Sequence, residues 1–347
     1  MRKRITVLMA VLLMGLFGCQ QKDSQPTEVE IGMTAIENEL YSDALASFEK
    51  AAAAEEDLVE AYRGEGMAYM GLGQYEDAVN SFQKALDETS ERQKEARKDI
   101  FYYQAAAMYR LEDFAGTVSV CNEILKIAPE GDAYYLRGTC YLEQGETEKA
   151  KLDFDTAVKE EPEDYDLYLN IYESYRENKL SAQGDEYLQK ALEIESSEEV
   201  DSYHKARIYY YLENYEEAQA QLTALVEEKN EDALILMGRV YQAMEDYPHA
   251  KNMYEQYIDQ YGETPEAYNG MVLADIAQED YDTALANIEK GLALSQERGK
   301  QELYFNQIVA YEYREDFATA KAKAQEYVER YPADEMGKKE LAFLQSR

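Results

Sequence analysis

Residues 59–86 read VEAYRGEGMAYMGLGQYEDAVNSFQKAL, and residues 131–158 read GDAYYLRGTCYLEQGETEKAKLDFDTAV. The first stretch places a glycine, a small residue and an aromatic residue at Gly66, Ala78 and Phe82. The second repeats the same offsets with Gly138, Ala150 and Phe154. Two helices nest closely only where one side chain is absent or is a methyl group. This pattern therefore predicts a pair of helices packed as a hairpin.

The small residue in the middle of this pattern recurs nine times along the chain, at steps of 32 to 39 residues. The nine residues are Ala44, Ala78, Thr117, Ala150, Gly184, Ala218, Ala250, Ala284 and Ala320. A period near 34 residues is typical of stacked helical hairpins. The sequence therefore predicts an all-α solenoid of about nine helix-turn-helix repeats over residues 29–334, with an extended surface in place of a single pocket.

The repeat resembles the tetratricopeptide repeat (TPR) in its positions as well as in its period. With each recurring small residue counted as position 20, the residues at position 8 include Gly32, Gly66, Ala105, Gly138 and Gly238. Those at position 24 include Phe48, Phe82, Phe154 and Tyr254, and Pro129, Pro162 and Pro332 occupy position 32. The resemblance implies a TPR-type α-solenoid wound as a right-handed superhelix. The repeats at 165–198 and 199–230 match less closely, with Tyr172 at the small position 8 of the first and Leu225 at position 27 of the second.

The N-terminal residues 1–18 have the composition of a targeting segment. Three basic residues at positions 2–4 precede an apolar run from Ile5 to Phe17, which has the length of a signal-peptide core. The run ends in Leu16-Phe17-Gly18-Cys19, which resembles the lipobox of bacterial lipoproteins. The resemblance implies cleavage before Cys19 and lipid attachment, including palmitate, to that residue. The alternative is an ordinary signal peptide that ends beside an unrelated cysteine.

A lipid on Cys19 would place the protein on the extracytoplasmic side of a cell membrane, or on an outer membrane in a cell that has two. Two acyl chains suffice for stable anchoring, and the polar residues 19–28 read as a flexible tether. The formal net charge of −36 argues against nucleic acid and anionic lipid headgroups as partners. We expect contact with the membrane through the lipid anchor only.

Few residues could carry chemistry. Cys121 and Cys140 fall on adjacent helices, where we expect two buried free thiols, with a disulfide as the alternative that an extracytoplasmic setting permits. The two histidines, His204 and His249, lie in different repeats without metal-ligand spacing, and His249 follows Pro248 in an expected interhelical turn. We therefore expect no catalytic residues, no metal, no cofactor and no enzymatic activity.

The surface that tetratricopeptide repeats use for binding is the concave groove lined by the first helix of each hairpin. Tyrosine and arginine, the side chains enriched at interface hot spots, recur at the groove positions of this acidic chain. The candidate partner-binding residues are Arg63, Tyr102, Tyr109, Arg110, Tyr135, Arg176, Tyr203, Arg207, Tyr210, Tyr211 and Arg239. We expect them to hold a segment of a protein or peptide partner.

The sequence thus predicts a lipid-anchored TPR scaffold or adaptor in the cell envelope. One alternative is a TPR-type component of an envelope assembly machine for outer-membrane proteins or pili, and another is a ligand-capture lipoprotein. The amphipathic residues 335–347 are expected to form a capping helix after the final repeat. The identity of the partner and the oligomeric state are left open.

Overall fold

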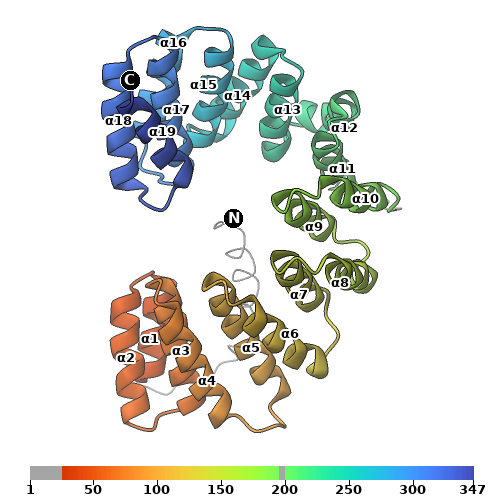
Figure 1. The fold of residues 1–347 in the computed structure, drawn as a ribbon, viewed down its shortest axis with the longest axis vertical. Coiled ribbons are helices and arrows are strands. Elements are labelled where there is room, and N and C mark those ends of the chain that lie inside the picture. Colours follow the sequence, from red (N-terminus) through yellow and green to blue (C-terminus); the bar gives the residue numbers. More distant parts are fainter. Residues whose placement is uncertain (1–25, 195–199) are drawn as a thin grey trace. The chain divides into compact units, whose positions relative to one another are not determined.

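The computed structural model describes residues 26–194 and 200–347. These described residues form nineteen α-helices and no strand, as the repeat pattern predicts (Figure 1). They divide into two compact units, Met1–Tyr187 and Leu188–Arg347, which are considered separately below. The expected signal peptide, Cys19 and most of the expected tether lie outside the described residues. None of the described helices combines the length and the apolar character that a membrane crossing requires.

The first unit contains the N-terminal hairpins. Its helices are α1 (Glu28–Glu37), α2 (Tyr41–Ala53), α3 (Leu58–Gly71), α4 (Tyr75–Glu88), α5 (Lys94–Arg110), α6 (Phe114–Ile127), α7 (Gly131–Glu143), α8 (Thr147–Glu160) and α9 (Tyr165–Glu177). Helix α10 (Ser181–Leu192) crosses the boundary between the units. The longest of these helices is α5, which absorbs part of the charged insertion that makes the 39-residue step.

The second unit contains the C-terminal hairpins. Its helices are α11 (Val200–Tyr211), α12 (Tyr215–Glu227), α13 (Glu231–Ala243), α14 (Tyr247–Tyr261), α15 (Pro265–Ala277), α16 (Tyr281–Ala293), α17 (Lys300–Tyr313), α18 (Phe317–Arg330) and α19 (Glu335–Gln345). Helix α14 begins before His249, so the expected interhelical turn at this histidine is wrong: Asp246 caps the helix and Pro248 sits in its first turn, where a missing amide hydrogen costs nothing.

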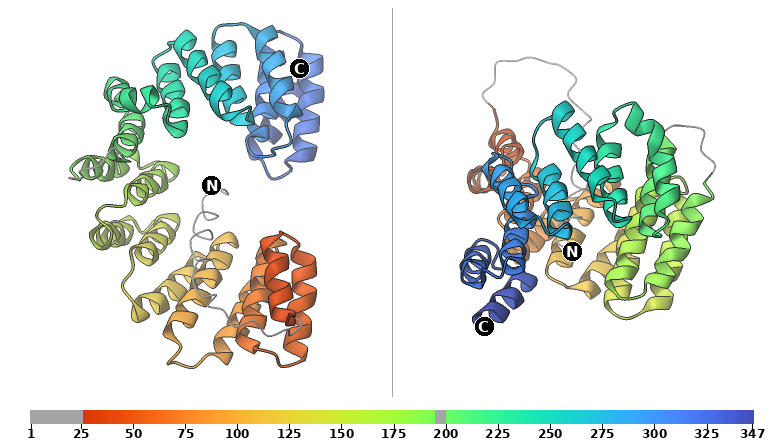
Figure 2. Two further views of the ribbon diagram at one scale, coloured as in Figure 1. Left: turned by 180° about the vertical axis from the view of Figure 1, so that it is seen from behind. Right: turned by 90° about the horizontal axis from the view of Figure 1, so that it is seen from above.

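Within each unit the helices pack as successive antiparallel hairpins, and each hairpin stacks on the next (Figure 2). First helices of neighbouring hairpins also touch, as α1 touches α3 and α3 touches α5 in the first unit, and α11 touches α13 and α13 touches α15 in the second. First helices of neighbouring repeats therefore share one side of each stack. This side holds the positions that the sequence assigns to a groove. The handedness of the superhelix stays a prediction.

Several hairpins are held by an aromatic ring that fills the space left by missing side chains. The ring of Phe48 lies where a Cβ on Gly32 would come within 2.7 Å and a Cβ on Gly64, in the next repeat, within 2.3 Å. Tyr254 occupies the same place between Gly238 and Gly270. The recurring small residues of position 20 are buried throughout, from Ala44 to Ala320. These contacts explain why glycine recurs at the predicted positions.

In the hairpin α9/α10 the large residue lies on the first helix and the glycine lies on the second. Its position 8 is Tyr172, and its position 20 is Gly184, where a Cβ would lie 3.0 Å from both the ring and the carbonyl oxygen of Tyr172. The large residue has moved to the first helix and the missing side chain to the second. The weaker match to the repeat at residues 165–198 thus reflects a compensated exchange rather than a loss of packing.

The turn inside every hairpin contains one residue with positive φ. It is glycine at Gly73 and Gly145, with φ of 73° and 75°, whereas other hairpins place Glu or Lys there with φ from 59° to 62°. In the third hairpin Glu112 and Asp113 donate amide hydrogen bonds back to Tyr109 O and Met108 O, both 3.0 Å. These bonds close the helix end in the left-handed conformation that glycine adopts most easily.

Two of the buried carboxylates, one in each unit, form close ion pairs. In the first, Arg137 donates two hydrogen bonds to Asp153, both 2.7 Å, and a third to Asn122. In the second, the fully buried Asp275 accepts from Lys251 at 2.5 Å and from Asn287 at 2.8 Å. Asp153 is paired with Arg137, and Asp275 has a cation and a neutral donor, so each buried carboxylate has the partners that a buried charge requires.

Candidate functional site

All the predicted groove residues lie on first helices, the helices that neighbour each other along one side of each stack. Arg63 is on α3, Tyr102, Tyr109 and Arg110 are on α5, Tyr135 is on α7 and Arg176 is on α9; in the second unit Tyr203, Arg207, Tyr210 and Tyr211 are on α11 and Arg239 is on α13. Arg176 and Arg239 are exposed and the others are partly buried. The two sets belong to different units and are described in turn.

Arg63 connects two neighbouring repeats. Its Nε donates to Asp99 Oδ2 of α5 at 2.7 Å, and its Nη1 donates to Glu60 Oε2 at 2.6 Å. The guanidinium also lies over the ring of Tyr103, 5.7 Å from its centre. Burial alone would lower the pKa of Arg63, but Asp99 and Glu60 raise it above its usual value. This arginine is engaged in holding α3 against α5.

Tyr102 has a comparable structural contact with the next repeat. Its hydroxyl donates to Glu130 Oε2 at 2.7 Å, and Lys98 donates to the other oxygen at 2.6 Å. Burial and this hydrogen bond raise the pKa of Tyr102. Burial works against ionisation of Glu130, yet the bonds from Lys98 and Tyr102 hold its pKa below the ordinary value. The cluster fixes α5 to the start of α7.

The remaining groove residues of the first unit make aromatic and polar contacts. The Tyr135 hydroxyl lies 3.3 Å from Ser174 Oγ of α9, and Tyr109 packs edge-on against Phe114 at 5.6 Å between ring centres. Arg176 pairs with Glu173 at 3.3 Å. Burial raises the pKa of Tyr109, and the negative charge of Glu143 adds to this effect. Arg110 is the last residue of α5.

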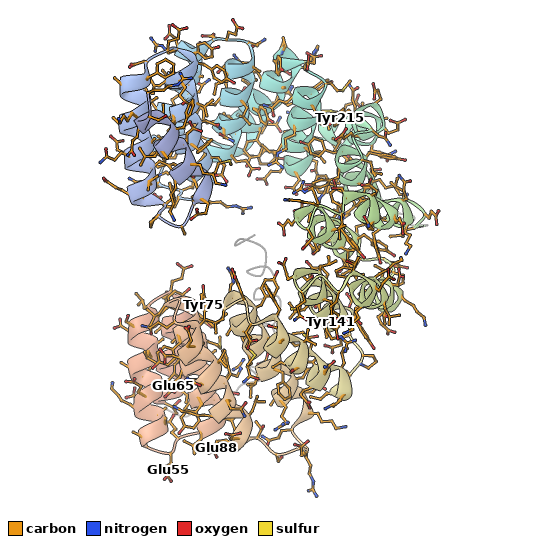
Figure 3. The ribbon with its side chains drawn as sticks, viewed as in Figure 1. Glu55, Glu65, Tyr75, Glu88, Tyr141 and Tyr215 are labelled. Atoms are coloured by element: carbon orange, nitrogen blue, oxygen red, sulfur yellow. The ribbon has the colours of Figure 1, made fainter. Side chains whose placement is uncertain are left out.

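In the second unit the predicted residues concentrate on α11. The guanidinium of Arg207 lies over the ring of Tyr203, 5.8 Å from its centre. One turn further, Tyr210 packs edge-on against Tyr211, 5.8 Å between ring centres, and in a tilted arrangement against Tyr215 at the start of α12, 6.0 Å between ring centres. Figure 3 labels Tyr215 at this hairpin. Four partly buried tyrosine and arginine side chains thus share one short helix.

Arg239 of α13 forms an ion pair with Glu266 of α15. Its contact is comparable to that of Arg63, because the carboxylate again comes from the N-terminal half of the following first helix. Sequence reasoning did not assign a role to these carboxylates. The signal that could have found them is an acidic residue near the start of successive first helices, at Glu60, Asp99, Asp132, Asp166, Asp232, Glu266 and Glu302.

The residues considered for chemistry are not brought together. Cys121 and Cys140 are buried free thiols, which confirms the favoured expectation over a disulfide. Burial raises the pKa of the Cys121 thiol to about 12, so it is not a thiolate at neutral pH. His249 is exposed, stacks on Tyr241 and pairs with Asp246 at 2.7 Å. No group of three His, Cys, Asp or Glu side chains within residues 26–194 and 200–347 is arranged to hold a metal ion.

Comparison with known proteins agrees with the repeat boundaries described above. Tetratricopeptide repeat family models match residues 59–91, 131–164 and 232–264. The three segments coincide with the hairpins α3/α4, α7/α8 and α13/α14. A crystal structure of a tetratricopeptide repeat protein from Parabacteroides merdae aligns with a TM-score of 0.52 and 16% identity, over 83% of this chain and 99% of that one.

Two curated relatives are similar over part of their length. A DnaJ homolog subfamily C member 7 homolog from Dictyostelium discoideum is 26% identical over 207 residues, 59% of this chain and 37% of that protein. A DnaJ homolog subfamily C member 3 from Gallus gallus is 26% identical over 32% of this chain and 24% of its own length. The matches therefore span 37% and 24% of the lengths of these relatives. The chain contains tetratricopeptide repeats, and its described residues form a helical solenoid of that type.

Proposed function

We propose that this protein is a lipid-anchored scaffold or adaptor on the extracytoplasmic side of a membrane, and that its first helices bind a segment of a partner protein. Tetratricopeptide repeat proteins bind protein or peptide partners, so the fold supports a binding role. The observation that carries the proposal is the concentration of Tyr203, Arg207, Tyr210 and Tyr211 on α11. The partner is a protein and its identity is open.

Helix α11 has the composition of an interface hot spot. Tyrosine offers a large rigid surface at a low cost in side-chain entropy, and arginine offers several donors in a fixed plane. Arg63 and Arg239 pair with carboxylates of neighbouring repeats, so these two arginines contribute to the stacking of repeats. Because four tyrosine and arginine side chains gather on α11, we assign partner contact primarily to this helix.

The binding role can be tested with a double variant on α11. Arg207→Glu with Tyr210→Ala should leave helical content unchanged and abolish recovery of the native partner in a pull-down from solubilised membranes. A matched control, Lys159→Glu with Leu152→Ala, changes one charge and removes one apolar side chain on α8, where both residues are exposed. Unchanged partner recovery with the α11 variant would contradict the proposal.

The lipid anchor is supported by the residues around Cys19. A basic segment, an apolar run too short to span a membrane comfortably and the Leu16–Cys19 sequence together resemble a lipoprotein signal. Cys19→Ser should remove metabolic labelling by a palmitate analogue and release the protein from the membrane fraction. Cys121→Ser is the matched control and should keep both label and membrane association. Retained labelling in Cys19→Ser would refute the anchor but leave the binding role untouched.

A further inference from the structure

Apolar side chains are exposed along α15 and α17, two neighbouring first helices of the second unit. Leu273 of α15 is 42% exposed, and Tyr313 of α17 is 61% exposed. Leu273 follows Asn269 by one helical turn and Tyr313 follows Asn306 by two, so each pair shares a helical face. Asn306 donates to Asn269 Oδ1 at 2.7 Å, which joins these two faces. Both exposed side chains therefore lie along the contact between α15 and α17.

The ring of Tyr313 stacks on a tyrosine of the preceding hairpin. Its centre lies 5.8 Å from the ring centre of Tyr281, the first residue of α16, and the two ring planes are inclined by 4°. Ile276, three residues after Leu273 on the same face of α15, is partly buried beside the apolar cluster of this hairpin. We call these four residues, Leu273, Ile276, Tyr281 and Tyr313, the Tyr313 surface. It combines an aromatic platform with aliphatic side chains.

Carboxylates outnumber basic groups in the two turns beside this surface. Residues 278–282 read QEDYD and residues 314–316 read RED, so the turns contain five acids and one base. The acids are Glu279, Asp280, Asp282, Glu315 and Asp316, and all five are exposed. The base, Arg314, pairs with Asp282 at 2.9 Å. The rim of the Tyr313 surface is therefore negative.

Two of the rim carboxylates cap helices. Asp280 Oδ1 accepts from the amide of Thr283 at 3.2 Å, and Asp316 Oδ1 accepts from the amide of Thr319 at 3.1 Å. Hydrogen bonds from the side chain and the amide of each threonine hold the pKa of its aspartate below the usual value. Both aspartates are therefore charged at neutral pH.

A segment that covers this surface has to match its apolar centre and its negative rim. Apolar side chains can cover Leu273 and Ile276. An ammonium or guanidinium group can lie over the exposed ring of Tyr313, because the face of an aromatic ring attracts cations. The rim carboxylates attract the same groups. A second copy of the chain fits less well, because two chains with a formal net charge of −36 each repel one another.

We propose that the Tyr313 surface is a docking site for a basic amphipathic segment of a partner protein. The apolar side chains of this segment contact Leu273 and Ile276, and an arginine or lysine lies over Tyr313. The site is on α15 and α17, separate from the residues on α11, and it goes beyond the proposed function. Because it needs no contact at α11, the two sites can be tested independently.

Fluorescence anisotropy with the full chain and a labelled probe peptide tests this site. The probe is an amphipathic peptide of leucine and arginine with about 18 residues, which is about five helical turns. A peptide of the same pattern with glutamate in place of arginine is the acidic counterpart. We expect the basic probe to bind and the acidic one not to bind. Tyr313→Ala should weaken binding of the basic probe about tenfold at unchanged helical content, because it removes the exposed ring.

Matched controls separate the site from the overall charge of the chain. Tyr261→Ala removes another exposed tyrosine of the same unit, on α14, and should leave the affinity unchanged. Glu279→Gln combined with Glu315→Gln should weaken binding about threefold at low salt. Glu245→Gln should not, although Glu245 occupies the same left-handed turn position in the hairpin α13/α14.

Three results would overturn the proposal. Equal losses from Tyr313→Ala and Tyr261→Ala, or no loss from either, would show that the basic probe binds through diffuse charge. Binding of both probes, or of neither, would contradict the chemistry of the partner. Self-association of the full chain in sedimentation velocity that Tyr313→Ala abolishes would assign the surface to a second copy of the chain.

Discussion

The hairpins α3/α4 and α9/α10 have the same topology but opposite distributions of side-chain volume. In α3/α4 the first helix carries Gly66 and the second supplies Phe82, whose ring fills the space beside it. In α9/α10 the first helix carries Tyr172 and the second supplies Gly184. Both arrangements let two helices approach closely. The comparison shows that the residue permitting close approach can lie on either helix of a hairpin.

Among the substitutions that test this comparison, removal of the aromatic ring should change the free energy of unfolding most. Phe82→Ala leaves a cavity beside two helices and should lower the free energy of unfolding by about 3–5 kcal/mol, measured by urea denaturation. Leu152→Ala, which truncates a side chain that is 68% exposed, is the control and should change stability little. A loss under 1 kcal/mol for Phe82→Ala would show that the ring does not hold the hairpin.

A smaller effect should follow from adding a methyl group to the glycine. A Cβ on Gly66 would lie 2.4 Å from the Phe82 ring, so Gly66→Ala should lower the free energy of unfolding by about 2 kcal/mol through overpacking. Combined with Phe82→Ala, the same substitution should cost clearly less than it does alone, because the ring it collides with is gone. Additive losses in this double-mutant cycle would be incompatible with the proposed contact.

The smallest effect concerns the turns of the two hairpins. Gly73 and Lys179 occupy the same left-handed turn position, with φ of 73° and 61°. Lys179→Gly should therefore raise the free energy of unfolding by about 1 kcal/mol, and Gly73→Lys should lower it by a similar amount. Thermal unfolding followed by circular dichroism measures both. A shift of the same sign for the two reciprocal changes would rule out the conformational explanation.

The sequence was sufficient to predict the repeat because its signal is local and periodic. Gly66, Ala78 and Phe82 lie within one hairpin, so their spacing alone specifies close packing. Contacts between repeats are harder to predict, because they join residues that lie far apart in the sequence. The partners of Arg63 and Tyr102 are Asp99 and Glu130, which lie 36 and 28 residues away.

The prediction for His249 failed for a different reason. Proline was interpreted as a turn residue, whereas Pro248 occupies the first turn of α14, where proline suits a helix. The burial of Asp275 could not be predicted either, because its hydrogen-bond donors, Lys251 and Asn287, come from the two flanking helices. Its acidic side chain looks like any exposed aspartate in the sequence.

The proposed function rests on α11 as the contact with a partner protein, and one measurement tests this most directly. A photo-crosslinking amino acid replaces Tyr210 on α11 or, as the control, Leu152 on α8, and adducts are identified by mass spectrometry from native membranes. We predict a discrete protein adduct from position 210 that is absent from position 152. The same set of adducts from both positions, or none from position 210, would contradict the assignment of α11 as the binding helix.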